Sequence, residues 1–285
     1  MPVFHGVKPG PFYREELTMS YRFTSRFAVF VAVALLLAAL GCAKAPYTNR
    51  SQMILMSSQE ELALGMQASQ QVLAEAKEET NTPAAAMTRR VGLRIAAAAD
   101  EPDPNLPARA KFDWEFHTLT SDTPNAFCLP GGKIFVYTGL LKYATTDAEL
   151  AAVIGHEVGH AIARHGAERA SQSQAAGLVG SVGSAILGPA FDAAYGLGVN
   201  YGILMPYSRL QESEADYIGL LLMAKAGYDP NAALSFWQKM ATAGGGKPPE
   251  WMSTHPSDES RIAEIKRQLP EAMAIYKARQ GKTTP

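Results

Sequence analysis

The sequence predicts an α+β fold that is mostly helical, with a small β-sheet flanking one central helix. Most of the chain has helical periodicity, in runs bounded by capping and stop residues at positions 57–79, 84–99, 146–165, 208–226 and 257–268. Strand-like stretches are fewer, at 111–119 and on either side of a Pro-Gly-Gly turn in 125–138. Helices therefore build the body, and short strands lie beside it.

The N-terminus has the anatomy of an export signal. Residues 21–26 are basic, and residues 27–40 form an apolar stretch too short to span a bilayer comfortably. The stretch ends in Ala39-Leu40-Gly41-Cys42, which resembles a lipoprotein signal. A plain secretory signal or a membrane anchor is the alternative.

This anatomy predicts the organisation of the chain. We expect residues 1–41 to be a signal peptide, with 1–18 an over-extended start before Met19, and Cys42 to be the lipidated mature N-terminus. Residues 42–56 are then a polar tether. Residues 57–285 form one domain, long enough to bury a sizeable core.

Composition excludes one class of partner. Charged residues make up 19% of the chain and the formal net charge is −1, so no basic surface for nucleic acid is expected. The chain has 2 cysteines, and acylation of Cys42 would leave Cys128 without a disulfide partner. Cys128 is interpreted as a buried small hydrophobic residue.

The pentapeptide His156-Glu157-Val158-Gly159-His160 is the most informative stretch. It lies in the expected helix 146–165, which Thr146 opens with a capping-box pattern and Gly166 closes. Residues four apart lie above one another on a helix, so both histidines can bind one metal ion. Glu157 lies beside them, where it can take a proton from the attacking water. The alternative, a surface helix with solvated histidines, conflicts with the apolar character of the segment.

A third zinc ligand is expected on the later helix 208–226. Glu212 and Asp216 share one of its faces with small residues that permit close approach to the first helix. Glu212 is the expected ligand, and Asp216 is expected to accept the outer N–H of a ligand histidine. Glu214 points about 200° away from Glu212. The alternative is an ordinary acidic helix face.

Two other features have simpler interpretations. His165 follows His160 but lies about 140° off its face, and His117 lies in a strand-like run, so neither is expected at the site. Residues 170–205 are rich in Gly, Ala and Leu. Their glycines interrupt a membrane hairpin, and we interpret them as a helix and loop beside the active site.

Four ordered motifs together resemble the gluzincin zinc metallopeptidases of the HtpX and CAAX-prenyl-protease type. They are the pentapeptide, Glu-Ser-Glu-Ala-Asp at 212–216, the segment 124–141, and Ser-Thr-His-Pro-Ser-Asp at 253–258. The resemblance covers about residues 57–269. It extends to the periplasmic lipoprotein branch, similar to LoiP, YcaL and BepA, and to the mitochondrial overlapping-activity protease. It implies a zincin-type metalloprotease domain.

The resemblance also implies roles for two further segments. Asn125, Ala126 and Phe127 would form an edge strand beside the active-site helix that holds the substrate backbone extended. A plain structural hairpin is the alternative. His255 would either donate to the oxyanion of the reaction or close the open metal position as a fourth ligand in a latent state. Arg261 is expected to pair with an acidic group of the core or to orient this loop.

Together these features predict a zinc-dependent endopeptidase that holds one Zn²⁺ per chain through His156, His160 and Glu212. Its expected substrates are unfolded or misassembled periplasmic and outer-membrane proteins. The expected location is the periplasmic face of the outer membrane, with acylated Cys42 in its lipid and the outer-membrane assembly machinery as a candidate partner. A non-proteolytic, chaperone-like assembly factor for outer-membrane proteins is the alternative, followed by a structural lipoprotein with a vestigial metal site.

Overall fold

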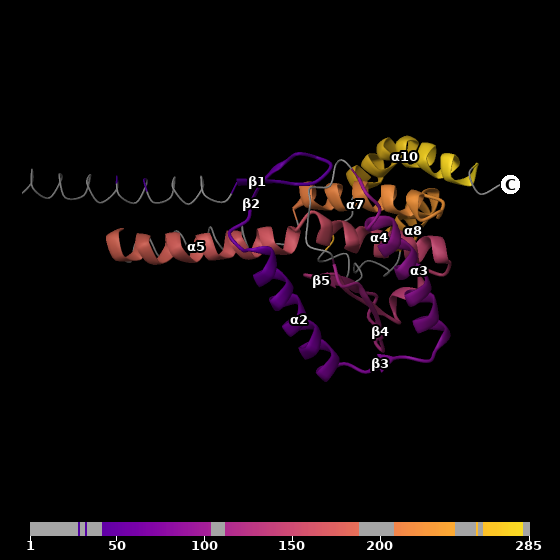
Figure 1. Ribbon diagram of the computed structural model, residues 1–285, viewed down its shortest axis with the longest axis horizontal. Helices are drawn as coiled ribbons and strands as arrows, with labels where there is room; N and C mark the ends of the chain where they lie inside the picture. The colour runs from indigo at the N-terminus through magenta and orange to yellow at the C-terminus, as the bar shows by residue number, and fades with distance from the viewer. Residues whose placement is uncertain are drawn as a thin grey trace, which may run out of the picture.

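The computed structural model describes residues 28, 32, 42–103, 112–187, 208–242, 255 and 259–281. Within these ranges helices dominate and a small sheet lies beside them (Figure 1), which confirms the predicted α+β class. The helices are α2 (Ser58–Glu75), α3 (Pro83–Ala99), the 3₁₀ turn η1 (Leu140–Lys142), α4 (Asp147–Ile162), α5 (His165–Leu187), α7 (Arg209–Lys225), α8 (Asn231–Thr242) and α10 (Glu259–Gln280).

The principal sheet has the strand order β3-β4-β6-β5. Its strands are β3 (Glu78–Glu79), β4 (Glu115–Leu119), β5 (Ala126–Leu129) and β6 (Lys133–Tyr137). The β4–β6 pair is parallel, whereas β3–β4 and β5–β6 are antiparallel. β5 is therefore an edge strand, and it packs against α4.

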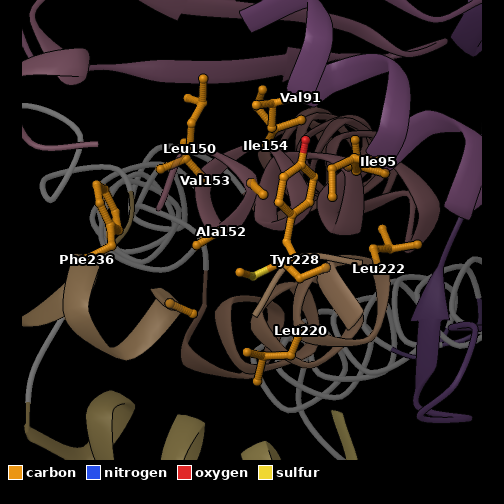
Figure 2. Close-up of a cluster of buried hydrophobic side chains, with 14 of the residues drawn as sticks. Val91, Ile95, Leu150, Ala152, Val153, Ile154, Leu220, Leu222, Tyr228 and Phe236 are labelled. Atoms are coloured by element: carbon orange, nitrogen blue, oxygen red, sulfur yellow. The ribbon is translucent and has the colours of Figure 1, made fainter. Parts of the chain in front are cut away.

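The elements form successive layers, from the sheet through α4 and α7 to α10 (Figure 1). Side chains of α3, α4, α7 and α8 meet in one apolar core, including Ile95, Ile154, Leu222 and Phe236 (Figure 2). Burial of these apolar surfaces is the main favourable contribution to folding, and it fixes α4 in the middle of the domain.

The N-termini of the central helices are well capped. Thr146 and Glu149 form the predicted capping box at α4, and Ser208 and Gln211 form another at α7. Each box satisfies backbone N–H groups that have no partner inside the helix. The caps therefore define where the two helices begin.

Three predicted helix boundaries differ in the structure. The first helix ends at Glu75, because Glu78 and Glu79 pair with β4 as a strand. α4 ends at Ile162, and Gly166 lies inside α5 rather than stopping a helix. The chain turns at Arg164, which has a φ of 57°. The last helix runs on through Pro270 to Gln280.

The segment expected as a tether contains a second, two-stranded sheet. β1 (Cys42–Lys44) and β2 (Ser51–Met53) pair as an antiparallel hairpin that packs near α5 (Figure 1). Residues 1–27 of the expected signal and residues 188–205 of the Gly/Ala-rich segment lie outside the described residues. Among the helices that the structure describes, none has the length and apolar character needed to span a membrane.

Candidate metal centre

Helix α4 carries His156, Glu157 and His160 to the middle of the domain. All three side chains are buried, with 2–3% of their surface exposed. His156 and His160 are one turn apart, and their Nε2 atoms lie 3.0 Å from each other. Two ring nitrogens at this separation in a buried site are arranged to bind the same metal ion rather than to contact solvent.

Helix α7 brings Glu212 to these nitrogens because its backbone packs directly against the backbone of α4. A Cβ added to Gly159 would lie 2.7 Å from the carbonyl oxygen of Ala215, and one added to Gly155 would lie 3.0 Å from that of Gly219. Any larger side chain there would push the helices apart. The small residues therefore let the Glu212 carboxylate reach the centre.

The donor atoms fit a single tetrahedral metal ion. The Oε1 atom of Glu212 lies 3.3 Å from the Nε2 atom of His160. One ligand atom from each of His156, His160, Glu212 and His255 lies within 4.8 Å of the others. Ligands at zinc-like bond lengths are roughly 3.3–3.5 Å apart in a tetrahedron. Two or three imidazoles with one carboxylate are also a donor set that zinc prefers.

Asp216 orients His156 through a hydrogen bond. The Nδ1–H of His156 donates to Oδ1 of Asp216 over 2.8 Å, which leaves the Nε2 lone pair directed at the centre. Arg261 donates from Nε to the other oxygen of Asp216 over 2.7 Å. Burial alone would raise the pKa of Asp216, but the charges of Arg261 and His156 outweigh it and lower that pKa.

His165 orients His160, and sequence reasoning missed it. The Nδ1 atoms of His160 and His165 are 2.8 Å apart, and Nε2 of His165 lies 3.1 Å from Oε2 of Glu214. Continuous helical geometry places His165 off the face of His160, but the turn at Arg164 starts a new helix and returns His165 to the site. The turn residue carried no recognisable sequence signal.

Arg261 also compensates the negative charge of Glu212. Its Nη1 atom lies 2.5 Å from Oε2 of Glu212, and its guanidinium carbon lies 3.6 Å from the ring centre of Trp237. Burial would raise the pKa of Glu212, but the Arg261 charge and hydrogen bonds from His160 and His255 hold it far below its ordinary value. The carboxylate is therefore ionised, as a metal ligand must be. The predicted pairing of Arg261 with a core acid is confirmed.

His255 lies among the candidate ligands. Its Nδ1 atom is 3.2 Å from Nε2 of His156 and 3.1 Å from Oε1 of Glu212. Its Nε2 atom lies 3.5 Å from Oε1 of Glu157, and Arg261 donates to its backbone carbonyl over 3.3 Å. The geometry gives His255 access to the metal position and to the neighbouring acid. Ser253 and Pro256, which flank it in the sequence motif, lie outside the described residues.

The expected substrate strand is β5. Ala126 and Phe127 belong to it, and Asn125 precedes it, its carbonyl accepting from the N–H of Tyr137. Phe127 stacks on Phe135 of β6 with ring centres 5.0 Å apart, which fixes the strand. Burial, then the nearby charge of Glu157, raises the pKa of the Cys128 thiol well above its ordinary value. A thiol in this state is a poor nucleophile.

A cavity of about 320 Å³ opens beside Glu212 and Arg261. It lies between α7 and α10, and its other lining residues include Leu210, Ser213 and Arg267. The cavity gives the buried centre a neighbouring space large enough for a side chain of a bound molecule.

Comparison with known proteins agrees with this geometry. A family model described as Peptidase family M48 matches residues 84–269. The mitochondrial metalloendopeptidase OMA1 of Schizosaccharomyces pombe is 45% identical over 161 residues, covering 56% of this chain and 48% of that protein. OMA1 of Saccharomyces cerevisiae is 33% identical over 245 residues, covering 82% of this chain and 70% of that protein. The beta-barrel assembly-enhancing protease of Escherichia coli is 29% identical over 188 residues, covering 62% of this chain and 37% of that protein.

The aligned part of the chain thus spans about half of the Schizosaccharomyces pombe protein. These similarities contradict the expected location at the periplasmic face of the outer membrane, because relatives that are 45% and 42% identical are named as mitochondrial proteins. That expectation depended on the leader anatomy before Cys42, most of which lies outside the described residues.

Proposed function

The chain belongs to peptidase family M48, and from that premise we propose that it is a zinc-dependent endopeptidase. One observation carries the proposal: His156, His160 and Glu212 converge on one buried point with Glu157 beside them. Three protein ligands, a fourth position and an adjacent carboxylate are what hydrolysis of a peptide bond at a zinc site requires.

Each residue has a role in this mechanism. When bound, zinc supplies the Lewis acidity that polarises the scissile carbonyl and acidifies the attacking water. Glu157 accepts the proton of that water and delivers it to the leaving amine. Asp216 holds His156 in the tautomer whose Nε2 lone pair faces the centre. Arg261 keeps Glu212 and Asp216 ionised in a buried site.

The substrates that we propose are unfolded or misassembled proteins. An edge strand such as β5 binds an added strand through backbone hydrogen bonds, which are largely independent of side-chain identity. Asn125, Ala126 and Phe127 would pair with a segment that is already extended, a condition that compact folded proteins rarely meet. The bacterial relatives named as beta-barrel assembly-enhancing proteases support misassembled membrane proteins as one such class.

We also propose that a lipid on Cys42 attaches the domain to a membrane. Strand β1 begins at Cys42, so the lipid would join the chain directly at the hairpin. The mass of the N-terminal peptide of the cell-derived protein tests this point. A free thiol at Cys42, or an intact chain upstream of it, would refute it.

The test of the catalytic proposal compares wild type with Glu157→Gln. We expect both proteins to bind about one zinc per chain. Only the wild type should degrade unfolded casein, because the variant lacks the base. A variant that retains zinc, fold and wild-type cleavage would refute the mechanism. A variant that is inactive on casein yet fully restores growth to cells lacking the protein would favour the chaperone-like assembly factor.

A further inference from the structure

A network of polar and charged residues connects the N-terminal hairpin to the metal centre. Arg50, just before β2, donates from Nε to Oε2 of Glu214 over 2.7 Å. Its two terminal nitrogens each donate to one oxygen of Glu168 over 2.8 Å. Thr48 donates its hydroxyl to the other oxygen of Glu214. The side chains of Glu168 and Glu214 are only 4% and 5% exposed, so Arg50 forms ion pairs with two buried carboxylates at once.

The direction of each hydrogen bond between Glu214 and His160 follows from the ligand geometry. If Nε2 of His160 faces the metal position, its proton resides on Nδ1 and must be donated outward. Nδ1 of His165, at 2.8 Å, then accepts it. The proton of His165 therefore resides on Nε2 and is donated to Glu214 over 3.1 Å. Each bond fixes the tautomer of the next group.

The last acceptor of this series depends on Arg50. Thr48 holds one oxygen of the Glu214 carboxylate and Arg50 holds the other, which places that second oxygen 3.1 Å from Nε2 of His165. Without the guanidinium, two carboxylates would be left buried beside each other with no cation between them. Like charges repel, so the Glu214 carboxylate would turn away from its present position and the acceptor that fixes His165 would be displaced.

We infer that Arg50 is a positioning residue for the metal ligand His160, acting through Glu214 and His165, and that the N-terminal hairpin is therefore a functional part of the metal centre. The inference rests on the proposed zinc site. Arg50 precedes residues 84–269, which the family model matches, so the family match does not include this contribution.

The test measures zinc affinity by competition with a colorimetric chelator, using the full chain and no proteolysis assay. Arg50→Met should bind zinc about 10- to 100-fold more weakly, as expected when a partner of a ligand histidine is lost. The absorption spectrum of the cobalt-substituted variant should also shift, because the geometry at the ion changes. Tyr47→Phe is the matched control. It removes another hydrogen bond of the same hairpin, from the Tyr47 hydroxyl to Asp103, but lies outside the network, so its affinity should equal that of wild type.

A double-mutant cycle distinguishes two roles of Arg50: positioning of His160 through the network, and simple attachment of the hairpin to the domain. His165→Phe breaks the network, so adding Arg50→Met to it should reduce zinc affinity no further. Additive losses would overturn the inference, as would wild-type affinity and an unchanged cobalt spectrum in Arg50→Met.

If Arg50→Met does not fold, Thr48→Val replaces it. This isosteric change removes the other hydrogen bond to Glu214 from an exposed residue and should weaken zinc binding about fivefold. No change in that variant would overturn the inference. Because only metal binding is measured, a wild type that binds zinc but cleaves nothing would refute the proposed function alone. A wild type that binds no zinc would refute both.

Discussion

Asp216 and Glu214 lie two positions apart on α7 and orient the two candidate ligand histidines of α4 in different ways. Asp216 accepts the outer N–H of His156 directly, over 2.8 Å. Glu214 accepts from His165, which in turn lies 2.8 Å from His160. Each carboxylate has its own arginine, Arg261 for Asp216 and Arg50 for Glu214. The two acids orient different histidines because residues two positions apart on a helix lie on different faces.

Substitution of the ligands distinguishes Glu212 from Glu214. His156→Ala, His160→Ala and Glu212→Ala should each lose bound zinc after gel filtration, because the loss of any one of these three ligands leaves the ion too weakly held. Glu214→Ala should keep about one zinc per chain, with the reduced affinity expected of an outer partner. Metal analysis of the purified variants checks this. Zinc retained without Glu212 and absent without Glu214 would show that the ligand choice is wrong.

Removal of the His255 imidazole should raise basal proteolysis. His255 lies 3.2 Å from Nε2 of His156, among the candidate ligand atoms, so we expect it to occupy the fourth metal position in a latent state. His255→Ala should then cleave casein, or itself, faster than wild type at equal zinc content. A time course of fluorescent casein cleavage measures the effect.

The other role of His255 predicts the opposite sign. As an oxyanion donor, its loss would slow turnover on the order of 10²-fold. A slower variant therefore supports that role over latency, and an unchanged rate excludes both. His117→Ala is a suitable control, because His117 lies on β4 and pairs with Glu78 away from the centre.

The contact between α4 and α7 predicts a pair of contrasting glycine variants. Gly159→Ala should lower the free energy of unfolding by about 1–3 kcal/mol, because its Cβ would lie 2.7 Å from a carbonyl oxygen. At Gly166, which lies in a helix, no atom of the described residues is within 4 Å of an added Cβ, so Gly166→Ala should raise that free energy by up to about 1 kcal/mol. Urea unfolding of the zinc-loaded proteins tests both. Equal effects would mean that the helix contact is looser than described.

Glu149 should make the free energy of unfolding depend on pH in the acid range. Burial raises its pKa, but the hydrogen bonds from Lys239 and Thr145 outweigh it and hold the pKa below the ordinary 4.5. The folded state therefore prefers the ionised form, and its contribution is complete above 4.5 and is lost as the pH falls towards the folded pKa.

The test of this dependence is a comparison with Glu149→Gln. At neutral pH the variant should be less stable by about 1–3 kcal/mol, through its weaker capping and lost ion pair. The difference from wild type should shrink as the pH is lowered through 4.5. Comparing two proteins cancels the protonation of the metal ligands. A difference that stays constant with pH would contradict the assignment.

The sequence was sufficient for the part of the site that depends on local periodicity. His156, Glu157 and His160 share one helix, and Glu212 and Asp216 share another, so their spacing determines how they lie relative to one another on each helix. Pairing with a core acid was one of the two roles expected of Arg261, and the structure identifies the acids as Glu212 and Asp216.

His165 and Arg50 were not predictable in this way. The position of His165 depends on the left-handed turn at Arg164, whose side chain donates to Glu61 and to the carbonyl of Met56 in a distant segment. Arg50 lies in a short hairpin without amphipathic periodicity, in a stretch whose composition resembles a linker. Contacts between segments far apart in the sequence determine the positions of both residues, and local sequence patterns do not reveal such contacts.

The hairpin has a practical consequence for how the protein is produced. A truncated version that starts at residue 84, where the family match begins, would lack Arg50, Thr48 and Glu61. Glu168 and Glu214 would then be deprived of their common cation, and Arg164 would lose the acid that holds its turn. Recombinant versions designed on the family boundary would therefore be prone to low metal content and aggregation, and their inactivity would say little about the full chain. Expression should begin no later than the hairpin.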